Sequence, residues 1–129
     1  MTYGRNLAAY SSVATHGGIA DGDPHRLILM LMDGALERLA MARGCLQRND
    51  IAQKATLVQK VMAIVQELRA SLDLERGGPL AGNLRDLYDY MERQLVKANV
   101  ENRLALLEEV AALLGEIRSA WAAVPLATR

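Results

Sequence analysis

The chain has 129 residues, 51% of them apolar, and its 15 basic side chains equal its 15 acidic ones in number. A neutral chain lacks the basic charge that supplies most of the affinity for nucleic acid, so a nucleic-acid partner is not expected. The single cysteine excludes an internal disulfide and suits the reducing cytosol. No apolar run is long enough to span a bilayer and residues 1–6 show no signal peptide, so we expect a cytoplasmic protein without direct membrane insertion.

Residues 1–22 contain only one short stretch with helical spacing. Leu7, Tyr10 and Val13 would share one face of about two helical turns, and the pair Gly17-Gly18 would end them. So short a helix is marginal in water unless it docks. The segment is therefore either a frayed terminus with one packed turn or a detachable cap that lies over an apolar groove.

The rest of the chain holds long stretches with apolar residues at helical spacing, over residues 24–48, 51–72, 80–98 and 103–124. Asp23 is expected to cap the first helix, and Asp50 to cap the second. The pair Gly77-Gly78 favours a turn with positive φ before the third helix. Pro125 is expected to end the fourth helix.

Four helices of about 20 residues joined by short turns predict an all-α fold, an antiparallel up-down-up-down four-helix bundle. We expect a mobile N-terminal helical cap segment over residues 1–22, the bundle over 23–125 and a tail over 126–129. Cys45 falls on the core side of the first helix, which predicts a buried and inert thiol. The core-facing stripe of the third helix is formed by Leu80, Leu84, Leu87, Met91, Leu95 and Ala98.

Three of the four predicted helices carry an apolar stripe wider than a small bundle needs. In the first helix, for example, Leu29, Met32 and Leu36 extend the stripe well beyond the usual arc. The surplus fits a well-packed core with some exposed leucines. It also fits an exposed groove that takes an amphipathic partner segment or a second copy of the chain.

No group of residues predicts an enzyme, a metal site or a cofactor site. The two histidines have no Glu-x-x-His pairing, and no glycine-rich phosphate loop is present. Glu108 and Glu109 are typical of a solvated face. Asp89 lies four residues from both Arg85 and Arg93, the spacing of a weak surface ion pair.

Three segments carry a resemblance to a known family: Leu-Met-Asp-Gly-Ala (31–35), Leu-Asp-x-x-x-Gly-Gly (72–78) and Leu-Tyr-Asp-Tyr-Met (87–91). With Trp121 near the end of the last helix, they make the chain resemble the FliS family of flagellin-specific export chaperones of bacteria. Two departures keep the local physics. Met32 stands where many members carry Tyr, and Asp-Pro-His (23–25) replaces the commoner Ser/Thr-Pro-Glu.

The resemblance implies an antiparallel helical bundle without catalytic activity or cofactor. Such a protein binds the C-terminal region of flagellin in the cytoplasm, prevents its early polymerisation and aids its delivery to the flagellar export gate. An export-gate membrane protein and an anti-sigma factor are further candidate partners. We expect a monomer or a weak homodimer, and the alternative is a structural homodimeric bundle without a flagellin client.

The candidate flagellin-binding residues are apolar or aromatic groove residues and polar anchors on the predicted helices. The groove candidates are Leu57, Ile64, Leu68, Leu72, Tyr88, Tyr90, Met91, Leu106, Leu113 and Ile117. The anchors are Asp33, Arg93 and Asn99, while Leu7, Tyr10 and Val13 form the N-terminal cap. Each groove residue, taken alone, could instead be an ordinary core or surface residue. Trp121 is expected to have a structural role at the end of the bundle.

Overall fold

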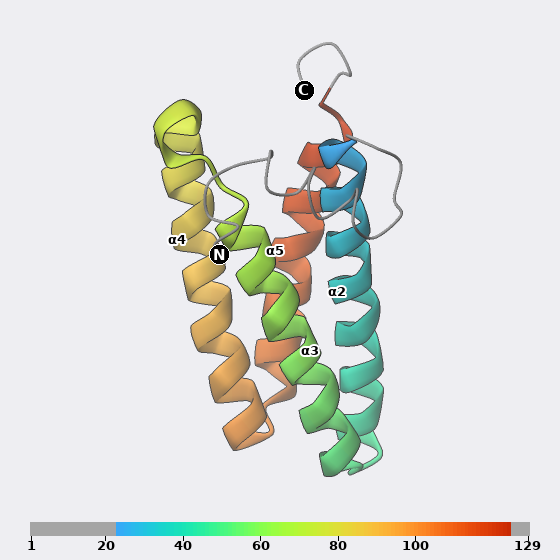
Figure 1. Ribbon diagram of the computed structural model, residues 1–129. Helices are drawn as coiled ribbons and strands as arrows, with labels where there is room; N and C mark the ends of the chain where they lie inside the picture. Colours follow the sequence, from blue (N-terminus) through green and yellow to red (C-terminus); the bar gives the residue numbers. More distant parts are fainter. Residues whose placement is uncertain (1–22, 125–129) are drawn as a thin grey trace.

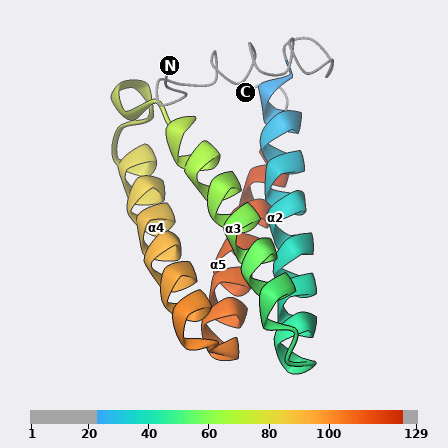
Figure 2. The same cartoon turned by 60° about the horizontal axis from the view of Figure 1, so that its bottom comes forward.

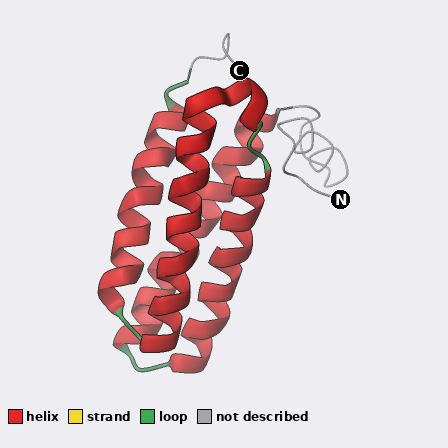
Figure 3. Cartoon of the chain, turned by 90° about the vertical axis from the view of Figure 1, so that its left-hand side faces the viewer, coloured by secondary structure: helices red, strands yellow, loops and turns green. Residues whose placement is uncertain are grey.

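The computed structural model describes residues 23–124, which form an antiparallel bundle of four helices (Figures 1 and 2). The helices are α2 (Pro24–Gln47), α3 (Ile51–Ala70), α4 (Leu74–Glu101) and α5 (Leu104–Ala122). Each of α2 and α4 packs against both α3 and α5. Within the described residues, Figure 3 shows only helices and the loops that connect them, so the predicted all-α bundle is confirmed. The predicted cap with Leu7, Tyr10 and Val13, and the tail, lie outside the described residues.

Three aspartates begin the helices in the way the sequence predicts for the first two. The side chains of Asp23 and Asp50 accept hydrogen bonds from the backbone nitrogens of Arg26 (3.0 Å) and Gln53 (3.3 Å). Asp73 does the same for α4. Each bond satisfies one of the free N–H groups of a first helical turn. The bounds of α2, α3 and α5 lie within two residues of those predicted, although α5 begins without a side-chain cap.

The third predicted helix is longer than the sequence suggested, because α4 begins at Leu74 rather than at Leu80. Asp73 caps a first turn that precedes the glycine pair, and a kink separates this turn from the rest of α4. Gly78 sits in the kink with φ 55° and ψ −138°, a conformation that residues with a Cβ avoid. The predicted positive φ is thus present, and Pro79 begins the main part of α4.

The core runs along the centre of the bundle and is built from all four helices. Met32, Leu39, Val61, Met91 and Leu107 are among its fully buried side chains. Cys45 is buried with them, as predicted. The residues that widen the apolar stripe of α2 differ in burial. Met32 is buried, whereas Leu36 is partly buried and packs against the core.

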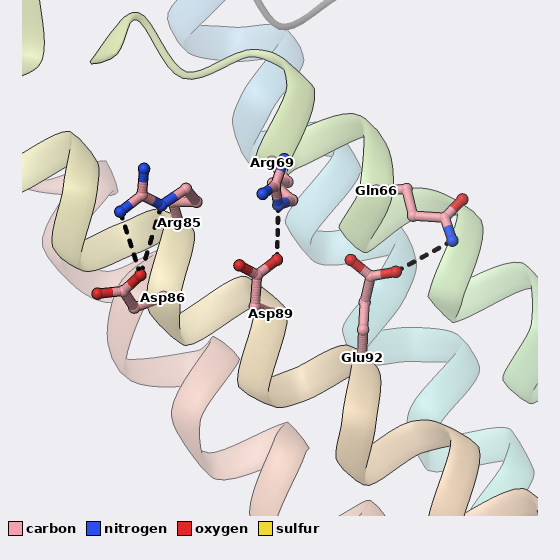
Figure 4. A network of polar contacts seen from close by, with 6 residues as sticks. All are labelled: Gln66, Arg69, Arg85, Asp86, Asp89 and Glu92. Carbon is pink, nitrogen blue, oxygen red and sulfur yellow. Dashed lines mark hydrogen bonds and ion pairs between the residues drawn. The ribbon is translucent and has the colours of Figure 1, made fainter.

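A row of polar contacts joins α3 and α4 on the outside of the bundle (Figure 4). Arg69 donates from Nε to Asp89 Oδ1, and Gln66 donates to Glu92 Oε2 at 3.0 Å. The predicted pairing of Asp89 with Arg85 or Arg93 is wrong, because the neighbouring helix supplies a closer cation. Arg85 pairs with Asp86 instead, at 3.4 Å.

Glycine substitutions at the kink and in the following turns should have opposite effects on stability. Gly78→Ala places a Cβ at a left-handed φ and should cost about 1–3 kcal/mol. Gly82→Ala is the matched control, because its Cβ would meet nothing within 4 Å inside α4 and should stabilise by about 0.5–1 kcal/mol. Urea unfolding of both variants measures the difference. Equal effects would show that the kink does not require glycine.

Tyr88 should make the fold sensitive to alkali. Its burial raises the pKa of the phenol to about 12, from a model-compound value of 10.0. At a pH between these two pKa values, the phenol of the unfolded chain releases its proton and the phenol of the folded chain keeps it. The free energy of unfolding therefore falls as pH rises, by about 2 kcal/mol at pH 11.5. Tyr88→Phe removes this loss, which urea titrations at pH 9 and pH 11.5 would detect. If wild type and variant lose equal stability, the phenol ionises as easily in the folded state.

Candidate functional site

The α4–α5 pair carries partly exposed apolar residues that border the core. The two helices lie close together near residue 102, where the chain joins them, and draw apart toward their other ends (Figures 1 and 2). Leu80 lies two turns from Tyr88 on the core-facing stripe of α4, yet its side chain is 68% exposed. A leucine with the helical phase of a core residue is therefore largely exposed at the end where α4 and α5 lie apart.

Other apolar residues recur at helical spacing on α4, and on α5 from the turn that follows Glu109, the residue that Tyr90 and Gln94 of α4 contact. They are half-buried, and several pack partly against the core. We call this surface the α4–α5 strip and define it by Leu80, Leu84, Leu87, Leu113, Ile117 and Trp121. From Glu109 to Trp121 it covers about 18 Å at 1.5 Å per residue. A partner helix of about twelve residues would match that length.

A polar cluster ends the strip on the side where the helices converge. Tyr90 donates its hydroxyl hydrogen to Glu109 Oε2 at 2.6 Å, and Gln94 donates to Glu109 Oε1 at 3.0 Å. These hydrogen bonds lower the pKa of Glu109 and raise that of Tyr90. The Arg93 guanidinium lies over the Tyr90 ring, 5.8 Å from its centroid. The strip is thus apolar along its length and anionic at this end.

The opposite end of the strip is held by a reciprocal contact between α2 and α5. Trp121 Nε1 donates to the His25 carbonyl oxygen at 3.1 Å, and His25 Nε2 donates to the Trp121 carbonyl at 2.7 Å. The two rings stack, with centroids 5.0 Å apart. Trp121 therefore joins the first turn of α2 to the last turn of α5, which agrees with the structural role expected for it.

The groove candidates chosen from the sequence fall into two groups. One group is buried in the core and reaches a partner only if the bundle opens: Leu57, Leu68, Tyr88, Met91 and Leu106. The other group is half-buried: Ile64, Leu72, Tyr90, Leu113 and Ile117. Of these, Leu113 and Ile117 belong to the α4–α5 strip and Tyr90 lies at its end. Ile64 instead packs beside Gly34 of α2, where its Cδ1 would lie 3.8 Å from an added Cβ.

The polar anchor candidates already have partners within the bundle. Asp33 accepts two hydrogen bonds from Arg118 of α5, at 2.8 and 3.3 Å. Asn99 accepts from Lys54 through both its backbone and its side-chain oxygen, at 2.8 and 2.7 Å. Asp33 and Asn99 therefore hold helices together in this structure, and Arg93 is placed over Tyr90.

Sequence reasoning missed two features of this surface. It placed Leu80 in the core stripe, because helical spacing shows which way a residue faces and not whether anything covers it; Leu84 of the same stripe does pack partly against the core. It also placed Glu109 on a solvated face. The spacing of Tyr90 and Gln94, four residues apart, was a usable signal for a shared acceptor, but the acceptor lies on another helix.

The described residues contain neither a cluster of metal ligands nor a helix that could cross a membrane. Between residues 23 and 124, no three His, Cys, Asp or Glu side chains come together where they could hold a metal ion. None of the four helices in this range is long and apolar enough to cross a membrane.

Comparison with known proteins agrees with a binding role. A family model described as flagellar protein FliS matches residues 6–128. The flagellar secretion chaperone FliSB of Pseudomonas aeruginosa is 50% identical over 115 residues, or 89% of this chain and 91% of that protein. The flagellar secretion chaperone FliS of Salmonella typhimurium is 41% identical over 116 residues, covering 89% and 86%. That of Bacillus subtilis is 35% identical over 98 residues, covering 76% and 72%. The chain therefore belongs to the FliS family of flagellar secretion chaperones.

Proposed function

We propose that this protein is a cytoplasmic chaperone that binds the C-terminal helical region of flagellin, prevents its premature polymerisation and aids its delivery to the flagellar export gate. The observation that carries the proposal is the exposure of Leu80. This residue has the helical phase of a core residue, but it is 68% exposed at the open end of the α4–α5 strip. Flagellin's terminal helices carry apolar stripes that stay unpaired until they enter a filament. A client of this kind needs a long apolar surface.

The shape of the strip supports recognition of a helix rather than of a small molecule. Its members repeat at helical spacing on two diverging helices, so apolar side chains of a third helix can fit between them at i, i+3 and i+4 positions. The buried candidates Leu57, Leu68, Tyr88, Met91 and Leu106 would join the contact only if client binding moves the helices apart. Ile64, Leu72, Asp33, Arg93 and Asn99 remain candidate contacts of a client that wraps further around the bundle.

The proposal includes no chemical step and no cofactor, so the protein acts by occupying the client's apolar face. It acts as a monomer or a weak homodimer in the free state. An export-gate membrane protein and an anti-sigma factor remain candidate further partners.

The first test is the stoichiometry with the client. Light scattering after size exclusion, with and without the last ~50 residues of flagellin from the same organism, should give a one-to-one complex. The peptide length suits a bundle whose helices are about 30 Å long. A firm homodimer that ignores the peptide would instead identify a structural bundle protein, and the proposal would be abandoned.

Leu80→Ser should weaken peptide binding about tenfold, because burying most of a leucine side chain against a partner contributes about 1.5 kcal/mol. Its free energy of unfolding should stay within about 0.5 kcal/mol of wild type, since the side chain is largely exposed in the free bundle. Val100→Ser is the matched control on the same helix, because Val100 is 77% exposed and lies outside the strip. Calorimetric titration that gives equal losses for the two variants would remove the strip from the binding surface.

Deletion of residues 1–15 tests the predicted N-terminal cap with Leu7, Tyr10 and Val13. A segment that covers the apolar surface competes with the client, so its removal should tighten or speed peptide binding. Stopped-flow association with the flagellin peptide measures both effects. Unchanged binding would argue against a covering role, and weaker binding would show that the segment itself contacts the client.

A further inference from the structure

We propose that Glu109 recognises a lysine or arginine side chain of the bound flagellin segment and so sets how that segment is positioned along the α4–α5 strip. The inference rests on the proposed function, because it adds a chemical requirement to the same binding surface. It starts from a difference between Glu109 and the other carboxylates that link helices.

Glu109 is an interhelical carboxylate whose two oxygens both accept hydrogen bonds from neutral groups of α4. Tyr90 and Gln94 donate to these oxygens at 2.6 and 3.0 Å. Arginines instead neutralise Asp33 (by Arg118), Asp89 (by Arg69) and Glu108 (by Arg43). Glu92, which links α4 to α3, accepts from the neutral Gln66 on one oxygen. Among the described residues, no lysine or arginine forms an ion pair with Glu109. Its negative charge is therefore fixed in direction but remains available to a partner.

The carboxylate has the capacity to accept a further partner. An ionised carboxylate offers about four acceptor positions, and Tyr90 and Gln94 use two of them. Its hydrogen bonds lower the pKa of Glu109, so the group is ionised at neutral pH. Because Tyr90 and Gln94 both lie on α4, they also fix the carboxylate over the α4–α5 boundary. A cation that arrives there meets an oriented acceptor.

The location of Glu109 links the charge to the apolar strip. Leu113 follows one turn later on the same face of α5, so the strip begins directly beside the carboxylate. A helix lying on the strip covers this end and excludes water from it, which makes a charge-assisted hydrogen bond stronger than one on an open surface. The matching client segment therefore has an apolar stretch of about twelve residues with a lysine or arginine at one end.

One fixed charge at the end of a uniform apolar surface determines register. Apolar contacts alone change little when a helix slides by one turn, because leucines at i and i+4 are equivalent. A cation that must reach Glu109 permits one placement and disfavours the others. Tyr90 and Gln94 are positioning residues in this account, since they act through the carboxylate.

Glu109→Gln removes the negative charge and leaves the shape of the side chain nearly unchanged, so it tests whether binding requires the charge. We expect binding of the flagellin peptide to weaken about tenfold and its dependence on salt to decrease, as the loss of a charge-assisted pair requires. Glu116→Gln is the matched control, because Glu116 is an exposed carboxylate two turns further along the same face of α5. Its variant should change binding less than about twofold.

The client supplies the second arm of the experiment. Each lysine and arginine of the peptide is replaced singly by glutamine, and each peptide is titrated against wild type, Glu109→Gln and Glu116→Gln. We expect one position whose loss is about tenfold with wild type and absent with Glu109→Gln, while Glu116→Gln leaves that loss unchanged. Tyr90→Phe keeps the charge but frees the carboxylate, so binding should weaken while its salt dependence remains.

The outcomes separate this inference from the function on which it rests. If wild type does not bind the peptide, both are overturned. If wild type binds and Leu80→Ser weakens binding, but no client cation couples to Glu109, the chaperone proposal stands and the role of Glu109 is wrong. If Glu109→Gln and Glu116→Gln weaken binding equally, the role of Glu109 is also wrong. The negative charge would then attract the client in general and would not set its register.

Discussion

Lys54 fixes the end of the bundle from which α4 and α5 diverge. Its side chain is 1% exposed, and its ammonium donates to both oxygens of Asn99 in the last turn of α4. Among residues 23–124 no carboxylate forms an ion pair with it, and burial lowers the pKa of the lysine. The last turn of a helix carries the negative end of its dipole, so the carbonyl of Asn99 partly replaces the missing counter-charge. A buried cation cannot give up its acceptors without a large cost, and this holds α3, α4 and the turn into α5 together.

The distribution of polar links determines where the bundle can accept a partner. Arginine–carboxylate pairs close α2 against α5, and the row in Figure 4 closes α3 against α4. Between α4 and α5 the side-chain hydrogen bonds of the described residues gather at Glu109, close to the end that Lys54 fixes. Beyond that point the half-buried residues of α4 and α5 include Leu84, Leu113 and Ile117, which pack against the core. A surface of this kind contributes binding free energy mainly by excluding water, which suits a client recognised by its apolar face.

The sequence determined most of the fold because the signals for it are local. Asp23 and Asp50 cap helices from within their own first turns, and Cys45 lies on a stripe that only a core can cover. Family motifs were enough to identify the chaperone family.

The surface was harder to predict, because it depends on which helix lies opposite. Leu80 has the spacing of a core residue, but it is exposed at the end where α4 and α5 lie apart. Asp89 has two arginines at the right spacing on its own helix, and Arg69 of α3 displaces both. Lys54 interrupts the core stripe of α3, and this interruption is visible in the sequence. Its reason becomes clear only in the structure, where Asn99 of α4 accepts its hydrogen bonds.

The contact between His25 and Trp121 has a consequence for how the protein can be observed. Trp121 is the only tryptophan in the chain. Its indole stacks on the imidazole of His25, at the end of the bundle where residues 23 and 124 lie. Its fluorescence therefore reports the separation of α2 from α5 at that end, whereas circular dichroism averages over all four helices. If the end frays before the core melts, the two optical transitions will not coincide, and the emission of one indole will measure a local opening in an otherwise intact bundle.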